Sequence, residues 1–312
     1  MTRLALVYPG QGSQKPGMGL PWRDTDSWRI AEMASTASGV DVPTLLCTAD
    51  AEQLKDTQHS QLATLTTSLM ALDHARRADL FEDCEIVGHA GHSLGEYSAL
   101  AAARALPFTD VVRLVAERGA AMRGAATDEP GGMAAIVGIA ADSLEHMVSG
   151  IEDCWIANDN GAEQYVVSGR PESVLRLANL ARDAKANLVS MLPVAGAFHS
   201  PLMANASTHL ADALKNTEFR SSREPIFSSV DASPHTDPGD FPGLLLQQLV
   251  APVCWRQVYA NLADRSDVII EVGPGRVLTR LGRRDHPGLS QITLNQPSDL
   301  AKILVRLSPA HG

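Results

Sequence analysis

The chain has 312 residues, 45% of them hydrophobic, and a formal net charge of −10, a composition typical of a globular protein with a sizeable core. The acidic balance argues against nucleic acid or an anionic membrane as a partner, and no apolar run approaches the roughly 18 residues of a membrane helix. The four cysteines are scattered without a C-x-x-C spacing. We therefore expect a cytoplasmic protein without a disulfide framework or a zinc site.

The first predicted element is a strand from Leu4 to Tyr8, an apolar run too short for a signal peptide. A glycine-rich loop from Pro9 to Gly19 follows, with neither of the two glycine-rich nucleotide-binding patterns. Such a loop either lets the backbone approach a ligand or makes a tight turn. Helices are expected at residues 27–36 and 64–80.

The stretch from Ile86 to Leu100 predicts a strand, a sharp turn and a helix, with Ser93 at the apex of Gly91-His92-Ser93-Leu94-Gly95. The turn needs glycines on both sides because the backbone crowds there and strains the serine. A helix starting at the serine points its free N–H groups toward an oxyanion beside the hydroxyl, and Glu96 suits its dipole. An incidental serine in a glycine-rich turn is the plainer alternative, but this context favours a nucleophile.

A further helix is predicted at residues 110–122, with an apolar inner stripe formed by Val111, Leu114, Val115 and Met122. Arg118 falls on the same stripe. From the residues alone we favour a solvated charge, whose long stem reaches from an apolar face to water. The alternative is a guanidinium turned inward, which would need an anionic partner.

Residues 131–194 predict a small unit inserted into a larger one. The expected strands are 133–137, 154–157, 164–168 and 188–193, and the expected helices are 141–148 and 171–186. This order is the ferredoxin-like βαββαβ pattern, bounded by Gly131-Gly132 and by the turn Val194-Ala195-Gly196. Residues 1–130 and 195–312 would then form one α/β subdomain with a parallel sheet, and an active site is expected in the cleft between the two units.

The chain returns from this insertion through Gly196-Ala197-Phe198-His199-Ser200. On this loop, beside the cleft, His199 is well placed to act as general base for Ser93. The chain has ten histidines, and any one of them is more often structural or exposed. His92 is a poor base candidate, because neighbouring residues on a sharp turn point in different directions.

The last part predicts strands at 225–230 and 268–272, and helices at 244–249, 255–262 and 276–281. Residues 231–242 are expected to be a surface loop. Packing is the favoured explanation of Gly273-Pro274-Gly275. A local basic face is either a solvated helix surface or a docking site for an acidic partner or for ligand phosphates; it comprises Arg276, Arg280, Arg283 and Arg284.

Motifs along nearly the whole chain resemble the family of malonyl-CoA:acyl carrier protein transacylases and polyketide synthase acyltransferases. They are Pro9-Gly10-Gln11-Gly12-Ser13-Gln14, Gly91 to Leu100, Arg118-Gly119, Asn158-Asp159-Asn160, Gly196 to Ser200, Gln248 to Val253 and Glu271 to Gly275. The resemblance implies an α/β-hydrolase-like large subdomain with a ferredoxin-like insertion, in agreement with the topology above. One departure is Gln61-Leu62-Ala63, where the family usually has Gln-Pro-Ala.

The resemblance also implies roles for individual residues. Ser93 would be the nucleophile and His199 its base, with the histidine held by a backbone carbonyl from the Gln248 segment. The backbone N–H groups of Gln11 and Leu94 would form the oxyanion hole.

Arg118 would hold the free carboxylate of a malonyl group, because a guanidinium fork matches a carboxylate and stays charged. The substrate pocket would include Phe198, Met122, His92 and Asn160. Phe198 and Leu94 match family members that prefer malonyl over methylmalonyl groups, since a bulky ring fills the space of an α-methyl group.

The implied activity is transfer of a malonyl group from coenzyme A to the pantetheine thiol of an acyl carrier protein, through a malonyl-O-serine, in fatty acid or polyketide synthesis. No cofactor is expected, because a thioester becomes an ester and then a thioester again. We expect a monomer whose partners are the carrier protein and the CoA thioester. The alternatives are an acyl-thioester hydrolase, a transferase for another acyl group or for a malonate decarboxylase carrier, and a non-catalytic docking protein. A metal hydrolase is disfavoured, because H-E-x-x-H is absent.

Overall fold

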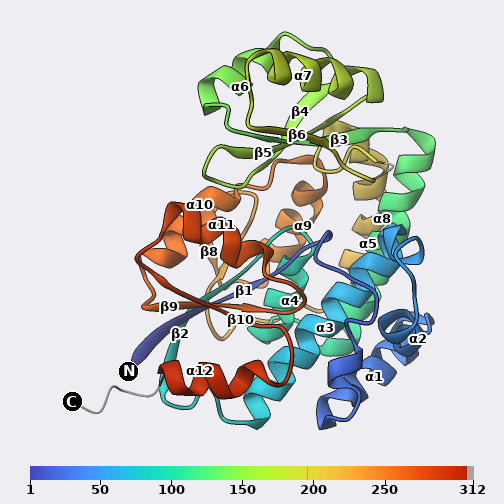
Figure 1. Ribbon diagram of the computed structural model, residues 1–312. Helices are drawn as coiled ribbons and strands as arrows, with labels where there is room; N and C mark the ends of the chain where they lie inside the picture. Colours follow the sequence, from blue (N-terminus) through green and yellow to red (C-terminus); the bar gives the residue numbers. More distant parts are fainter. Residues whose placement is uncertain (195, 308–312) are drawn as a thin grey trace.

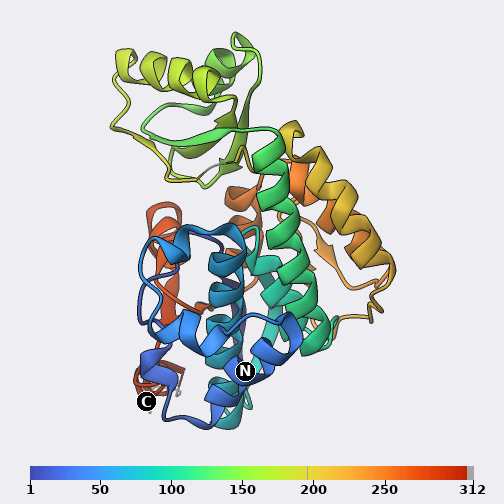
Figure 2. The ribbon, with the colours of Figure 1, turned by 90° about the vertical axis from the view of Figure 1, so that its right-hand side faces the viewer.

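A computed structural model describes residues 1–194 and 196–307 (Figure 1). These residues form a large unit around one sheet and a small unit around a second sheet. Figure 2 shows the small unit at one end of the molecule, where the long helix α5 (Phe108–Asp128) runs up to it. The predicted fold class, α/β with a parallel sheet and an inserted ferredoxin-like unit, is confirmed.

The sheet of the large unit has the described strand order β10-β9-β1-β2-β7-β8, and all neighbours are parallel except β7 and β8. From Leu4 to Tyr8, the central strand is buried on both faces, as expected for a parallel sheet covered by helices. The strands are β1 (Thr2–Tyr8), β2 (Cys84–Gly91), β7 (Ile226–Phe227), β8 (Pro234–His235), β9 (Val268–Val272) and β10 (Ser290–Leu294).

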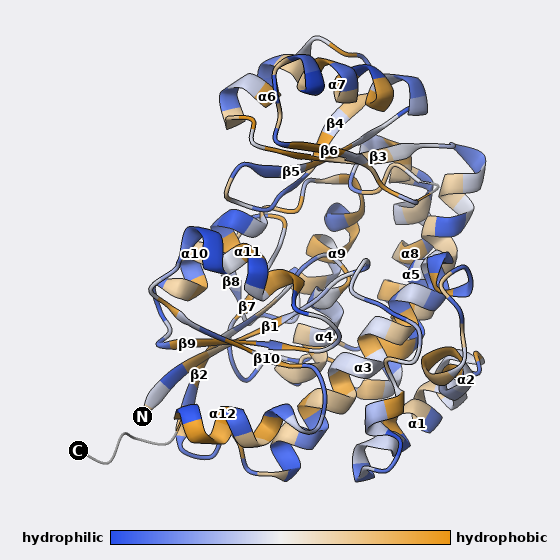
Figure 3. Cartoon of the chain, in the orientation of Figure 1, coloured by the Kyte–Doolittle hydropathy of each residue, from blue (hydrophilic) through white to orange (hydrophobic). Residues whose placement is uncertain are grey.

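Helices cover both faces of this sheet, and Figure 3 shows hydrophobic colour on its strands and hydrophilic colour on the outer sides of α10 and α11. Besides α5, the helices of the large unit are α1 (Arg29–Ser38), α2 (Val42–Cys47), α3 (Thr57–Arg77), α4 (Gly95–Ala102), α8 (Ala204–Lys215), α9 (Asp240–Val250), α10 (Trp255–Ala263), α11 (Val277–Asp285) and α12 (Asp299–Leu307). None of the helices in the described ranges is long and apolar enough to cross a membrane.

Several element boundaries differ from those predicted. The helix expected at 64–80 begins at Thr57, because the side chain of Asp56 accepts a hydrogen bond from the backbone N–H of His59 and caps it. The strand expected at 225–230 is reduced to the two residues of β7. The surface loop expected at 231–242 was wrong in part, since it contains β8 and the start of α9. Helices α2, α8 and α12 and strand β10 were not predicted.

The small unit comprises β3 (Gly132–Val137), α6 (Ala141–Ser149), β4 (Cys154–Asp159), β5 (Gln164–Gly169), α7 (Pro171–Asp183) and β6 (Leu188–Met191). Its antiparallel sheet has the order β4-β5-β3-β6, as a ferredoxin-like unit requires. The side chains of Leu144, Val167 and Leu177 form part of a separate apolar core. The predicted return turn includes Ala195, which lies outside the described residues.

The end of β4 joins the small unit to the large one. Val253 donates its backbone N–H to the carbonyl of Ala157 at 2.8 Å and accepts a hydrogen bond from Asp159 at 3.0 Å. Beside these bonds, Arg256 pairs with the carboxylate of Asp159 at 2.8 Å. The polar side chains that follow β4 are thereby fixed over the carboxyl ends of β1 and β2.

Candidate active site

Ser93 lies in the turn between β2 and α4, with φ at 51°. This left-handed conformation is unusual for a residue with a side chain. At a strand-to-helix turn it directs the serine hydroxyl away from the backbone. A Cβ on Gly91 would collide with the backbone of Gly95, and one on Gly95 would collide with the carbonyl of Tyr8. The predicted need for glycines thus has a steric cause. The helix α4 begins at Gly95, two residues after the serine.

His199 lies against this serine: its Nε2 is 2.8 Å from Ser93 Oγ, and its Nδ1 is 2.8 Å from the backbone oxygen of Gln248. A carbonyl only accepts, so Nδ1 carries the proton and Nε2 accepts from the serine hydroxyl. Burial, followed by the charge of Arg118, lowers the pKa of His199 to about 3. The imidazole is therefore neutral near pH 7 and free to accept a proton.

Arg118 is 1% exposed, so the favoured interpretation of a solvated charge was wrong. The inner face of α5 points toward the serine, and polar oxygens there take the place of water. Arg118 Nη1 donates to Gln61 Oε1 at 2.8 Å. Arg118 Nη2 donates to Ser93 Oγ and to Gln248 Oε1, each at 3.0 Å. Within the described residues its Nε has no hydrogen-bond partner. A guanidinium held only by uncharged acceptors has retained capacity for an anion.

The two backbone N–H groups predicted to form an oxyanion hole belong to Gln11, after β1, and Leu94, before α4. Neither donates to any acceptor in residues 1–194 and 196–307. Gln11 lines the cavity beside Ser93. Leu94 is at the N-terminus of α4, where an unpaired N–H group is suited to a developing negative charge.

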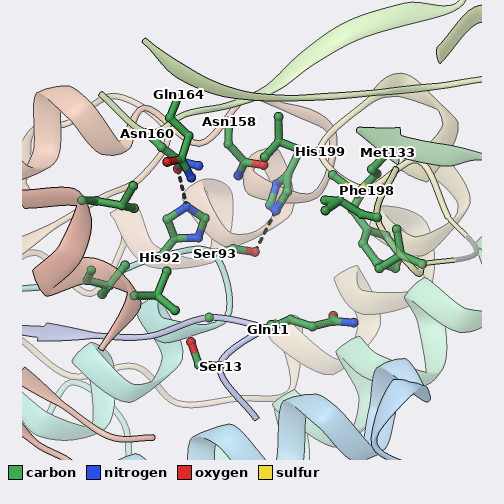
Figure 4. A pocket seen from close by; sticks show the side chains of 18 of the residues that line it. Gln11, Ser13, His92, Ser93, Met133, Asn158, Asn160, Gln164, Phe198 and His199 are labelled. Carbon is green, nitrogen blue, oxygen red and sulfur yellow. Dashed lines mark hydrogen bonds between the residues drawn. The ribbon is translucent and has the colours of Figure 1, made fainter. Parts of the chain in front are cut away.

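Ser93, His199 and Arg118 share one cavity of about 210 Å³, between the two units. The predicted pocket residues Phe198, Met122, His92 and Asn160 also line it, whereas the side chain of Leu94 is buried elsewhere. In Figure 4, Ser93 points toward His199, and His92 points toward Asn160, its hydrogen-bond partner at 2.9 Å.

The small unit forms the wall opposite the serine. Three amide side chains from this wall meet the cavity, and Figure 4 shows them beneath the small sheet: Asn158, Asn160 and Gln164. Sequence reasoning did not identify Gln164, nor the apolar Met133, Val166 and Leu192, as pocket residues. Their pattern is that of ordinary strand and loop residues, so the sequence contained no separate signal for them.

Glu96 and Gln61 were also missed as parts of the site. Glu96 is 2% exposed, and its Oε2 accepts hydrogen bonds from Ser229 and Gln248. The available signal for Glu96 was that it is the one charged residue of α4, whose other residues are uncharged and mostly buried.

The four arginines of the predicted basic face are exposed on and just before α11. Two of them also donate hydrogen bonds, Arg283 to the backbone of Gln291 and Arg284 to the side chain of Gln164. No group of three or more His, Cys, Asp or Glu side chains in the described part of the chain could hold a metal ion.

A serine at a strained strand-to-helix turn, with a neutral histidine bonded to its hydroxyl, is an arrangement typical of enzymes that transfer acyl groups. The family described as acyl transferase domain matches residues 5–298. The chain therefore belongs to the acyl transferase family, as its motifs predicted.

Named relatives agree with this assignment. The chain is 34% identical over 307 residues to the malonyl CoA-acyl carrier protein transacylase of Bacillus subtilis, covering 96% of each chain. It is 31% identical to an acyl-carrier-protein-S-malonyltransferase structure from Bartonella henselae, with a TM-score of 0.92 and coverage of 97% and 99%. A malonyl-transacylase in complex with a type II PKS acyl-carrier protein matches with 30% identity, a TM-score of 0.93 and coverage of 98% and 100%.

Proposed function

We propose that this chain is an [acyl-carrier-protein] S-malonyltransferase, which moves a malonyl group from coenzyme A to the pantetheine thiol of an acyl carrier protein through malonyl-O-Ser93. The observation that carries this proposal is the 3.0 Å hydrogen bond between Arg118 and Ser93 Oγ. It puts a buried cation beside the nucleophile, where a free substrate carboxylate would lie. An enzyme for uncharged acyl chains would have no use for it.

In the first half-reaction, Ser93 Oγ attacks the thioester carbonyl while His199 Nε2 takes the hydroxyl proton. The hydrogen bond from Nδ1 to the Gln248 carbonyl orients the ring and stabilises the imidazolium. The amides of Gln11 and Leu94 bind the tetrahedral oxyanion, and each such donor is worth roughly 10²–10³ in rate. The proton on Nε2 then passes to the sulfur as the C–S bond breaks and coenzyme A leaves.

In the second half-reaction, the thiol of the carrier's pantetheine attacks the acyl-serine, and His199 takes the thiol proton and returns it to Ser93 Oγ. One thioester is consumed and one is formed, so the exchange needs no cofactor, metal or energy source. The amide wall of Asn158, Asn160 and Gln164 suits pantetheine, because its two amide groups need partners in a desolvated channel.

We also propose a preference for malonyl over methylmalonyl groups. Phe198 is 6% exposed and lines the cavity, where its ring fills space that an α-methyl group needs. Competition between the two thioesters tests this preference, and equal use would contradict it.

We also propose a division of the chain into two subdomains, a cellular location and an oligomeric state. Residues 131–194 are proposed as the insertion and residues 1–130 and 195–312 as the catalytic subdomain. The chain is proposed to act on the acyl carrier protein as a cytoplasmic monomer. Its mass by light scattering, alone and with the carrier, tests the oligomeric state.

The proposed function is tested by incubating the purified chain with malonyl-CoA labelled in the malonyl group and a pantetheinylated carrier protein. We expect label on the carrier and, without the carrier, label on the enzyme. Release of free malonate at the same rate with and without the carrier would instead identify a thioester hydrolase.

A further inference from the structure

A buried carboxylate lies behind the site, in a place that the proposed chemistry does not use. Glu96, in the first turn of α4, is 2% exposed and follows Ser93 by three residues. A carboxylate buried in this way is costly unless several donors surround it. The hydrogen-bond partners of Glu96 therefore indicate its role.

Three donors converge on one oxygen of this carboxylate. Oε2 accepts from the backbone N–H of Ser229 at 3.2 Å, from its hydroxyl at 2.8 Å and from Gln248 Nε2 at 2.7 Å. Burial raises the pKa of Glu96 overall, and the hydrogen bonds from Ser229 and Gln248 oppose that rise. A side chain that only accepts from three donors matches the ionised carboxylate.

The side chain of Gln248 connects this carboxylate to the catalytic groups. Its Nε2 donates to Glu96 and, at 3.1 Å, to the backbone oxygen of Ser93, while its Oε1 accepts from Arg118. A flipped amide would turn an oxygen toward the carboxylate and an NH₂ group toward the guanidinium, and both contacts would be repulsive. The two charges therefore select one orientation of the amide.

We infer that Glu96 is a positioning residue: through the side-chain amide of Gln248, it holds the guanidinium of Arg118 in the orientation that receives the substrate carboxylate. This inference rests on the proposed function. Its consequence is that Glu96 contributes to the choice of acyl group without touching the substrate.

A second buried carboxylate provides a matched control. Glu271, at 0% exposure, accepts from the backbone N–H groups of Leu278 and Thr279, at 3.1 and 2.8 Å. It caps the start of α11 and, among the described residues, makes no hydrogen bond to Gln248 or Arg118. Glu271→Gln removes a buried charge of the same kind without affecting this network.

The experiment measures kcat and KM for malonyl-CoA and acetyl-CoA, with holo carrier protein as acceptor. It compares the wild-type chain, Glu96→Gln, Glu271→Gln, Arg118→Ala and the double variant Glu96→Gln/Arg118→Ala. We expect Glu96→Gln to lower kcat/KM for malonyl-CoA about tenfold, mainly through KM, and that for acetyl-CoA less than about twofold. Glu271→Gln should leave the malonyl-to-acetyl ratio unchanged.

In the Arg118→Ala background, Glu96→Gln should have no further effect on the ratio, because the group it positions is gone. An unchanged ratio in Glu96→Gln, an equal loss for both substrates, or a full effect in the Arg118→Ala background would overturn the inference. Should Glu96→Gln not fold by circular dichroism, Gln248→Met replaces it, since it removes the amide and keeps the backbone carbonyl for His199. The same loss of ratio is then expected, and an unchanged ratio overturns the inference.

Failure of the wild-type chain to transfer malonyl groups would overturn the proposed function as well as this inference. Normal malonyl transfer by the wild-type chain, together with an unchanged ratio in the variants, would overturn only the inference.

Discussion

The two units contribute different kinds of groups to the same cavity. The large unit provides Ser93, His199 and Arg118, and both Ser93 and His199 have left-handed backbones, with φ at 51° and 60°. The small unit provides amide and apolar side chains, from a sheet whose edge strand β6 is largely exposed. Under the proposed function, the groups that make and break bonds must be held within fractions of an ångström, whereas a flexible pantetheine arm tolerates a less rigid wall.

The hydrogen-bond networks of the two units also differ in how deeply they are buried. In the large unit, Arg118, Gln248 and Glu96 are almost fully buried and bonded to one another. In the small unit, the side chain of Asn160 is hydrogen-bonded to His92, which is only partly buried. Substitutions in the large unit should therefore have large effects on chemistry, and those in the small unit small effects on binding.

Ser93→Ala gives the largest expected effect. Removing the nucleophile should lower malonyl transfer by at least about 10⁴-fold while the fold is retained, because alanine is smaller and adds no new clash. Single-turnover transfer to the carrier protein measures it. Substantial transfer by this variant would refute the assignment of the nucleophile.

Arg118→Ala is next. Loss of the buried cation should lower kcat/KM for malonyl-CoA by about 10²- to 10³-fold, the cost of breaking a buried charge pair with the substrate carboxylate. Acetyl-CoA has no carboxylate, so its kcat/KM should fall much less. Equal losses for the two substrates would show that Arg118 does not bind the carboxylate.

Asn160→Ala probes the small unit. We expect about a three- to tenfold rise in KM for malonyl-CoA with kcat nearly unchanged, as for the loss of one hydrogen bond to an uncharged group. Steady-state kinetics checks this. A fall in kcat/KM comparable to that predicted for Arg118→Ala would remove the distinction between the two units.

The smallest expected effect is that of pH. His199 acts as a base only when its imidazole is neutral. Its pKa of about 3 lies below that of a free imidazole. Activity should therefore fall only as the pH approaches this lowered pKa. The pH profile of kcat/KM for malonyl-CoA should be level from about pH 8 to about pH 5. Half-loss at about pH 6.5 would show that burial does not lower the pKa of His199.

The sequence predicted the strained turn at Ser93 and the ferredoxin-like order well, because both depend on local patterns. The inward position of Arg118 was not predicted from the helix pattern, since burial of a charge depends on acceptors such as Gln61, 57 positions earlier in the chain. The link from Glu96 to Gln248 spans 152 positions and has no local signature. Polar networks of this kind arise from tertiary packing, and hydrophobic periodicity does not report them.

The central claim is that a hydroxyl, an imidazole and a guanidinium in one cavity form a malonyl-serine. Intact-protein mass spectrometry after brief mixing with malonyl-CoA, followed by peptide mapping, tests it most directly. We predict one malonyl group per chain, on Ser93, which is lost when holo carrier protein is added. No adduct, or an adduct that persists in Ser93→Ala, would contradict the account.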